Sequence, residues 1–347
     1  MSEPVAIVGA GWYGCYAADY LSARGVPFVL VDQKGTVFGG ASAANQNRLH
    51  IGFHYPRSAA TRRECAEGYR RFARQFPDFL RDLNTFYFVA KQSIVDYSTY
   101  TAIFKQEGVP FREVDLAEAE SVCGMRLVSG YLDANACVRC DEKWIDPAAA
   151  KQFYAAKYGS RVLTHIPTGT CGVLDCTYGQ ANAPSDATYE VCIALIYRQT
   201  THTAPFALTV MDGEFFSIHP YQLDSDTNKL LYTVTHVTHT PVAETSCAKD
   251  AKRVAGAFGA EDVEPLKKKM LDDLTRFVPD FESHFEYVGY LASVKCKFRD
   301  AGSADRSMRV WHPRTDVMSF CGGKITGIFG MDTHLDAFCR DRNKCLL

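Results

Sequence analysis

The sequence predicts an α/β protein in which a parallel sheet flanked by helices is joined to a second, mainly antiparallel sheet. The chain opens with a short apolar run, Val5–Val8, which is followed by a glycine-rich turn and a helical pattern. A second apolar run, Phe28–Val31, follows that helix, and strands that alternate with helices are typical of a parallel sheet. Residues 189–240 instead contain several strand patterns in succession, which favours an antiparallel sheet.

Length and composition are those of a globular protein with a sizeable core. The 347 residues suffice for two domains or for one large domain with insertions. Hydrophobic residues make up 47% of the chain and charged residues 22%, so no covalent staple is needed to hold the fold. The formal net charge of −2 gives no reason to expect nucleic acid as a partner. No apolar run is long enough for a membrane span, and the N-terminus lacks the layout of a signal peptide.

The 13 cysteines predict free thiols rather than a disulfide framework, because their number is odd and they are scattered along the chain. Cys137 and Cys140 form a C-x-x-C pair, but no second pair at zinc-site spacing accompanies it. We therefore predict no metal site and a cytoplasmic location, where thiols stay reduced.

The first unit of the chain predicts a nucleotide-binding site. Gly9, Gly11 and Gly14 fit G-x-G-x-x-G and lead into a helix with an apolar face. These glycines allow a tight turn, close approach to a pyrophosphate and close helix–strand packing. Asp32 ends the second strand, where a carboxylate can accept from a ribose 2′-hydroxyl and would repel a 2′-phosphate, which argues against NADP. The contact residues expected here are Gly9, Gly11, Trp12, Tyr13, Gly14, Asp32 and Gln33. This motif alone does not choose between FAD and NAD.

Three later parts of the chain bear on that choice. The first is the polar stretch at 38–58, which contains HIGFHY; the second combines SRVLTH with GVLDCTYGQ; the third is the stretch at 308–338 that contains CGGKITGIFG. With the N-terminal unit, they resemble the D-amino-acid-oxidase-like (DAO) superfamily of FAD-dependent oxidoreductases. The motifs are nearest to its L-2-hydroxyglutarate and glycerol-3-phosphate dehydrogenase-type members. The resemblance covers roughly half of the chain and implies FAD as the cofactor.

The resemblance also implies which further residues meet the cofactor. The polar stretch would run beneath the flavin, the second part would approach the adenosine half, and the third would meet the flavin's pyrimidine edge. The residues concerned are Gly40, Ala41, Ser42, Asn45, Asn47, Arg48, Leu49, Val162, Thr177, Tyr178, Gly179, Gly322, Gly323, Lys324, Ile325 and Thr326. One departure is that only IPTGTC lies where the family carries a longer β-meander, so we expect a more open adenosine side.

The third part also makes physical sense without the resemblance. Val317–Phe320 reads as a strand, and Gly322 and Gly323 form a turn with free backbone donors. Thr326 is placed to cap a following helix. Donors at such a turn stabilise negative charge on a reduced flavin.

The remaining patterns complete a two-domain prediction. Asp146–Pro147 starts a helix, FYFVA is a strand, and Asp212–Gly213 is a hairpin turn. The Lys267–Lys269 run reads as the solvated face of a helix. We expect a discontinuous Rossmann-type FAD-binding domain with an inserted α+β, mainly antiparallel substrate domain. The FAD-binding domain comprises residues 1–80, 142–185 and 295–347, and the substrate domain comprises 81–141 and 186–294.

The chemistry that the resemblance implies is oxidation of a C–H bond next to an OH or NH group, with hydride transfer to flavin N5. The substrate is a small 2-hydroxy acid, amino acid or amine, and an anionic group is expected on it. His50 or His54 is the candidate base, since imidazole titrates near neutral pH. Arg309 is the first candidate for binding a carboxylate, followed by Lys295, and Tyr221 adds a hydroxyl donor.

Two other classes stay open. A flavin-dependent monooxygenase that uses NAD(P)H shares the first glycine motif, although no late GDA segment is present. A flavoprotein that serves only as a binding module is the third possibility. The sequence does not identify the electron acceptor, which is oxygen, a quinone or another oxidant.

Overall fold

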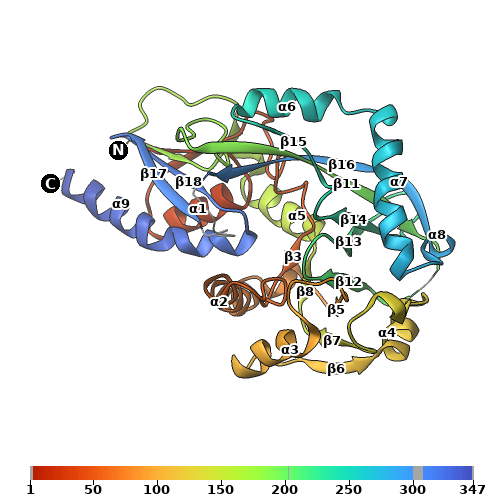
Figure 1. The fold of residues 1–347 in the computed structure, drawn as a ribbon. Helices are drawn as coiled ribbons and strands as arrows, with labels where there is room; N and C mark the ends of the chain where they lie inside the picture. Colours follow the sequence, from red (N-terminus) through yellow and green to blue (C-terminus); the bar gives the residue numbers. More distant parts are fainter. Residues whose placement is uncertain (1–2, 202, 300–307, 346–347) are drawn as a thin grey trace.

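Two large sheets lie side by side in the protein (Figure 1). The computed structural model describes residues 3–201, 203–299 and 308–345. Within them, Figure 1 shows the ends of the chain on the side of the smaller of the two large sheets. None of the helices in this described part is both long and apolar enough to cross a membrane.

The sheet that carries the predicted nucleotide unit has six strands in the order β17-β18-β10-β1-β2-β9. Its strands are β1 (Val5–Val8), β2 (Phe28–Val31), β9 (Val162–Leu163), β10 (Val173–Asp175), β17 (Arg309–Arg314) and β18 (Val317–Cys321). Every neighbouring pair is parallel except β17 with β18. The short apolar runs therefore form a buried parallel sheet, as the sequence predicts.

Helices pack on this sheet through an aromatic core. They are α1 (Trp12–Ala23), α5 (Pro147–Tyr158), the 3-10 helix η4 (Ile325–Met331) and α9 (Asp332–Cys345), with a short 3-10 turn η3 (Gly159–Arg161) after α5. The indole of Trp12 contacts the rings of Phe38, Phe72 and Tyr154 in edge-on geometry. Asp146 caps α5 by accepting from the backbone of Ala148 and Ala149.

The second sheet has nine strands, and all but one of its pairs are antiparallel. The strands are β5 (Asn84–Val89), β6 (Arg112–Asp115), β7 (Ala136–Cys140), β11 (Ala187–Gln199), β12 (Phe206–Met211), β13 (Phe216–Leu223), β14 (Leu230–His236), β15 (Pro241–Thr245) and β16 (Phe285–Phe298). The exception is the parallel pair β5 and β12. β11 and β16 pair along their whole lengths, from Ala187 opposite Phe298 to Gln199 opposite Phe285.

Helices cover this sheet on its outer sides. In Figure 1, α6 (Ala248–Ala257) and α7 (Ala260–Phe277) lie along the β11–β16 end, while α3 (Tyr97–Gln106) and α4 (Leu116–Cys123) lie beside β6 and β7. The short helix α8 (Phe281–His284) leads into β16, and the 3-10 turn η2 (Ser129–Tyr131) precedes β7. The helix predicted around Lys267–Lys269 is α7, and Lys268 on it is exposed.

A small three-stranded sheet joins the two halves. It consists of β3 (Arg48–Leu49), β8 (Lys143–Ile145) and β4 (Leu80–Arg81). Helix α2 (Ala59–Gln75) and the 3-10 turn η1 (Pro77–Phe79) link β3 to β4 along the chain. The strands of the six-stranded sheet all fall within the ranges expected for the FAD-binding domain, whereas β16 crosses the expected boundary at residue 295.

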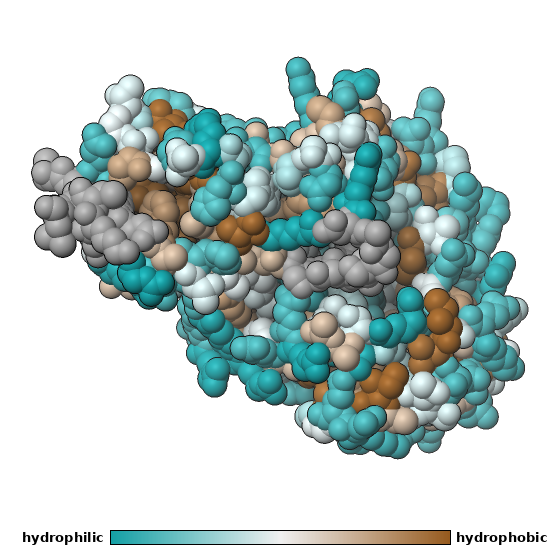
Figure 2. Space-filling model, turned by 60° about the vertical axis from the view of Figure 1, so that its left-hand side comes forward, coloured by the Kyte–Doolittle hydropathy of each residue, from teal (hydrophilic) through white to brown (hydrophobic). Residues whose placement is uncertain are grey.

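The described surface mixes polar and apolar side chains, and the described cysteines form no disulfide bond with one another. On the face shown in Figure 2, apolar side chains are scattered among hydrophilic ones. In the part of the chain whose side chains are described, the cysteines are free thiols, and most are buried.

Candidate active site

A cavity of about 940 Å³ lies between the two sheets. The turns at the carboxyl ends of β1, β2, β10 and β18 form one side of it, which is where open α/β sheets bind ligands. Strands β11, β12, β13, β14 and β16 supply the opposite wall. The sequence-predicted residues that line it are Gly9, Gly11, Trp12, Tyr13, Asp32, Gln33, Gly40, Ala41, Ser42, Asn45, Asn47, Arg48, His50, His54, Thr177, Tyr178, Lys295, Gly322, Gly323, Lys324, Ile325 and Thr326.

The glycine turn after β1 is built for close backbone packing. Gly9 has a φ of 98°, and a Cβ there would lie 2.6 Å from the carbonyl oxygen of Cys176. A Cβ on Gly14 would lie only 1.7 Å from the carbonyl oxygen of Gly9. Gly14 thus serves the packing of α1 against the turn and does not line the cavity.

Asp32 and Ser42 hold this turn in place. The Asp32 carboxylate accepts from the backbone N–H of Ala10 at 3.0 Å and from that of Lys34 at 2.9 Å. The backbone N–H of Trp12, at the start of α1, donates to Ser42 Oγ at 3.0 Å. The polar stretch is therefore tied to the helix terminus at which anions bind.

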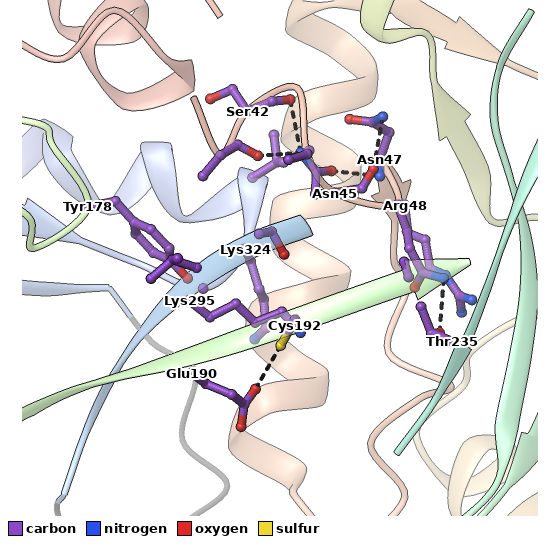
Figure 3. A pocket seen from close by; sticks show the side chains of 18 of the residues that line it. Ser42, Asn45, Asn47, Arg48, Tyr178, Glu190, Cys192, Thr235, Lys295 and Lys324 are labelled. Atoms are coloured by element: carbon purple, nitrogen blue, oxygen red, sulfur yellow. Dashed lines mark hydrogen bonds between the residues drawn. The ribbon is translucent and has the colours of Figure 1, made fainter. Parts of the chain in front are cut away.

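In the stretch from Gly40 to Asn47, the Asn45 side chain forms its hydrogen bonds with the backbone of the stretch itself. The Asn45 amide donates to the carbonyl oxygens of Ala41 (3.1 Å) and Ser42 (2.9 Å), and its Oδ1 accepts from the Asn47 N–H at 2.6 Å. These bonds shape a rigid loop along the cavity wall (Figure 3).

The turn after β18 reaches the cavity beside Tyr13. The Tyr13 hydroxyl donates to the carbonyl oxygen of Lys324 at 3.1 Å, and a Cβ on Gly322 would lie 2.1 Å from that hydroxyl oxygen. The ammonium of Lys324 lies 3.3 Å from Glu64. The expectation that Thr326 caps a helix is wrong, because Lys324 occupies the cap of η4 without a side-chain bond and Thr326 lies inside that helix.

Arg48 presents a buried cation to the cavity. Its Nη1 donates to Thr209 Oγ1 at 3.1 Å, whereas Nε and Nη2 are buried and have no hydrogen-bond partner in the described part of the chain. Burial lowers the pKa of Arg48 from its usual value. A desolvated guanidinium with two unused donors attracts an anionic ligand.

Two histidines stand next to Arg48. The ring centroids of His50 and His54 are 5.6 Å apart, and both side chains line the cavity. Burial, aided by the charges of His54 and Arg48, holds the pKa of His50 well below 6.5. His50 is thus neutral at pH 7 and able to accept a proton.

The opposite wall carries a charged row on β11 and β16. Glu190 forms an ion pair with Lys297 and accepts from the Cys192 thiol at 3.2 Å. Burial raises the pKa of Cys192 to about 11, so this thiol stays protonated. Figure 3 shows Lys295 and Lys324 entering the same region of the cavity from β16 and from the turn after β18.

Two predicted substrate contacts lie outside the cavity lining. Arg309 does not line the cavity; its guanidinium pairs with Asp186 at 3.3 Å and lies 4.5 Å from the centre of the Phe298 ring. Tyr221 is buried, and its hydroxyl donates to the carbonyl oxygen of Ala43 at 3.0 Å behind the polar loop.

Three predicted cofactor contacts also lie outside the cavity lining. Leu49 is fully buried in the core, and Val162 is in β9 at the edge of the six-stranded sheet. Gly179 accepts from the Tyr189 hydroxyl at its carbonyl oxygen. A Cβ on Gly179 would lie 2.6 Å from Cys296 Sγ, so close packing against Cys296 requires glycine at this position.

Sequence reasoning missed residues whose neighbours are distant in the chain. Gln46 donates to Thr233 and Thr235 at 3.1 Å and so links the polar loop to β14. Glu142 lies 3.9 Å from His50 but follows β7, far away in sequence. Of these residues, only Gln46 could have been found from the sequence, because it lies in a stretch rich in polar side chains.

A second histidine cluster lies at the edge of the cavity. His236 Nε2 and His239 Nε2 each lie 3.4 Å from Asp273 Oδ2. The Thr238 N–H donates to His236 Nδ1 at 3.1 Å, which places the proton of the neutral ring on Nε2. In that tautomer the Nε2–H of the neutral His236 ring lies beside the Asp273 carboxylate.

The residues of the main cavity fit FAD. The glycine turn and the α1 terminus suit a pyrophosphate, and the volume suits a large ligand. The two unpartnered nitrogens of Arg48 and the ammonium of Lys295 supply further donors for anionic groups.

Comparisons with known proteins bear on the fold and the cofactor. Residues 4–170 match the family described as FAD dependent oxidoreductase (DAO). The chain is 29% identical over 340 residues to FAD-dependent monooxygenase FPY4 of Fusarium mangiferae, covering 93% of this chain and 87% of that protein. It is 25% identical over 370 residues to FAD-dependent monooxygenase kojA of Aspergillus flavus, covering 93% and 82%.

Solved structures share the fold. Glycine oxidase from Geobacillus kaustophilus aligns with a TM-score of 0.64 at 15% identity, covering 94% of this chain and 90% of that one. L-proline dehydrogenase from P. horikoshii aligns with a TM-score of 0.65 at 12% identity, covering 95% and 91%. Residues 4–170 thus match the DAO family of FAD-dependent oxidoreductases, and the whole chain shares its fold with glycine oxidase and L-proline dehydrogenase.

Proposed function

We propose that this protein oxidises a small substrate at a carbon that bears an OH or NH group. The substrate is a 2-hydroxy acid, an amino acid or an amine, and substrates that carry a carboxylate are preferred. FAD, when bound, supplies the hydride acceptor for this chemistry. The protein binds and orients the substrate and accepts the proton of its OH or NH group.

One observation carries the proposal: Arg48 and His50 face the same cavity from one short segment. The unpartnered Nε and Nη2 of Arg48 form one edge of the guanidinium fork, which matches the two oxygens of a carboxylate. A carboxylate bound there is held close to a neutral imidazole. In 2-hydroxy acids and amino acids the carboxylate is next to the reacting carbon, so a carboxylate-binding residue and a base in the same cavity suit them.

Lys295 supports an anionic substrate from the opposite wall. It lines the cavity from β16, and no carboxylate lies within ion-pair distance of its ammonium in the described residues. Lys297, two residues further on, is already paired with Glu190. An additional anionic group on the substrate would therefore meet Lys295 rather than Lys297.

The test is steady-state oxidation with an artificial electron acceptor and no added NAD(P)H. A dye replaces the natural acceptor, so the assay works whether that acceptor is oxygen or a quinone. The panel contains both enantiomers of 2-hydroxy acids and amino acids, with the corresponding uncharged alcohols and amines as controls. We expect dye reduction by the carboxylates; dye reduction by none of the panel would overturn the proposal.

A second candidate is an FAD-dependent monooxygenase that uses NAD(P)H. The observation in its favour is that the relatives at 29% and 25% identity, which align with this chain over most of their length, are named FAD-dependent monooxygenases. In this case NAD(P)H would reduce the flavin, and one oxygen atom from O₂ would appear in the product. Consumption of NADPH that requires an organic substrate would support this candidate over the first.

A further inference from the structure

We infer that Glu142 is a positioning residue for His50: its carboxylate keeps the ring proton on Nδ1, so that Nε2 offers its lone pair to the substrate. The role of the substrate in this statement rests on the proposed function, whereas the state of the ring does not. Glu142 does not line the cavity itself and acts only through His50.

The Glu142 carboxylate is buried and held from several sides. The residue is 3% exposed. Its Oε1 accepts from the Ile51 N–H at 2.8 Å, and its Oε2 accepts from the Tyr87 hydroxyl at 2.7 Å. Burial raises the pKa of Glu142, and the bonds from Tyr87 and Ile51 together with the charge of Arg48 oppose that rise. These donors all favour the ionised form.

The free lone pair of Oε2 faces His50. Nδ1 of His50 lies 3.9 Å from Oε2, and this nitrogen is buried with no hydrogen-bond partner in the described ranges. A neutral imidazole carries one N–H, and the carboxylate favours that N–H on the nitrogen nearest to it. A ring rotation that closes about 1 Å would make a full hydrogen bond, as catalytic contacts often do when substrate binds.

The four groups whose charges affect the ring most act in the opposite sense. Arg48 on β3, His54 on the same loop, His219 on β13 and Lys324 after β18 all disfavour an imidazolium at His50. Glu142 is the acid that lies within ion-pair distance of His50 among the described residues. It therefore offsets the charge that His50 acquires when it takes a proton.

The step balances with the oxidation put forward under Proposed function. The O–H or N–H bond of the substrate breaks, and its proton moves to His50 Nε2. The neighbouring C–H bond breaks, and its hydride, with both electrons, would pass to the acceptor that bound FAD would supply. The substrate loses two hydrogens and two electrons, and His50 becomes an imidazolium beside the Glu142 carboxylate.

The test reads the His50 tautomer directly by NMR of the FAD-loaded protein with ¹⁵N-labelled histidine, and it needs no substrate. His50→Asn assigns the signals. We expect Nδ1–H in the natural protein and a mixture of tautomers in Glu142→Gln. With an oxidisable substrate, Glu142→Gln should lower kcat about 10- to 100-fold with KM changed less than about threefold. Glu142→Asp should recover part of the loss.

The matched control is Glu107→Gln, which removes a carboxylate that pairs with Arg62 outside the cavity. It should leave the His50 signals unchanged. If Glu142→Gln does not fold, Tyr87→Phe takes its place: the loss of one donor makes Oε2 a stronger acceptor, and the His50 N–H signal should shift downfield.

An Nε2–H tautomer in the natural protein would overturn the inference, as would His50 signals that no substitution at Glu142 or Tyr87 moves. A protein that shows the expected tautomer but oxidises none of the panel would instead refute the proposed function and leave the Glu142–His50 relation standing.

Discussion

Two arginines illustrate how strongly function depends on the direction of a single side chain. Both Arg48 and Arg309 occur in segments that the sequence associates with the flavin. Arg309 is paired with Asp186 and stacked on Phe298. Arg48 keeps two buried donors unpartnered at the cavity wall. The same residue type therefore stabilises the fold at one position and is available for a ligand at the other.

Replacing the two arginines in turn should separate these roles. Arg48→Ala should raise KM for a carboxylate substrate about 100-fold, about 2.7 kcal/mol, because a buried charged hydrogen-bond partner is lost. Arg309→Ala should change KM less than about threefold. Steady-state kinetics on FAD-loaded variants measure both, and a larger effect at Arg309 than at Arg48 would contradict the assignment.

Glycine at position 14 should be indispensable for cofactor binding. A Cβ there would overlap the carbonyl oxygen of Gly9, so Gly14→Ala must displace the turn that meets the pyrophosphate. We expect a fall of about 100-fold or more in FAD affinity, measured by titration of the apoprotein. The matched control is Gly256→Ala on α6, where a Cβ meets nothing within 4 Å. This change should leave affinity intact and stabilise the fold by up to about 1 kcal/mol.

The depressed pKa of His50 sets the direction of the pH dependence. The base form exists above the pKa, and burial together with His54 and Arg48 holds that pKa well below 6.5. The value of kcat/KM for a 2-hydroxy acid should therefore stay level from pH 8 down through pH 6.5 and fall only in more acidic solution. A half-maximum at or above pH 6.5 would show that His50 is not the base, or that its ring is exposed.

The same shift contributes to the stability of the fold. Because the unfolded chain binds a proton at His50 more readily than the folded chain, stability falls as the pH drops below the unfolded value of about 6.5. This contribution disappears in His50→Gln.

At the scale of elements, local patterns sufficed for the strands and helices but only partly for the site. Val5–Val8, Phe28–Val31 and the helix that starts at Asp146 follow from apolar runs and capping residues that are contiguous in sequence. The polar loop was recognisable from its density of hydrogen-bonding residues. Its anchoring by Tyr221 was not, because that contact joins residues 178 positions apart.

The same reason explains Glu142 and the β11–β16 wall. A single acidic residue after a strand has no recognisable sequence pattern. The role of Glu142 could not be predicted, because its contacts with His50 and Tyr87 form only when β3, β5 and β8 come together in the fold. The Glu190–Lys297 pair likewise depends on the register of β11 with β16, which residues alone do not reveal. Sequence patterns thus predict the cofactor side better than the substrate side.

The link between Tyr221 on β13 and the polar loop predicts a specific effect. Tyr221→Phe leaves the carbonyl oxygen of Ala43 without its donor, at a cost of about 0.5–1.5 kcal/mol in unfolding free energy. Loosening the loop should also weaken FAD binding about 3- to 10-fold. Tyr131→Phe is the control, since Tyr131 is 46% exposed on the surface. Equal FAD affinities in the two variants would mean that the bond does not hold the loop.

At the scale of the whole molecule, the cavity exists because two sheets of different construction meet. The six-stranded sheet presents the turns at its carboxyl ends, and the nine-stranded sheet closes the other side with charged and polar side chains. The fold is shared with proteins whose solved structures carry different names, such as glycine oxidase and L-proline dehydrogenase. The substrate of this chain is therefore decided by the residues of its own cavity wall.

The most direct test of the account is the visible flavin spectrum of the purified FAD-loaded protein under strictly anaerobic conditions. It is recorded after addition of a 2-hydroxy acid or amino acid from the panel, and separately after addition of NADPH. The account predicts that the organic substrate bleaches the flavin without NADPH, and that Arg48→Ala slows this bleaching while Arg309→Ala does not. Bleaching by NADPH, with no response to any substrate of the panel, would contradict the account and favour the monooxygenase alternative.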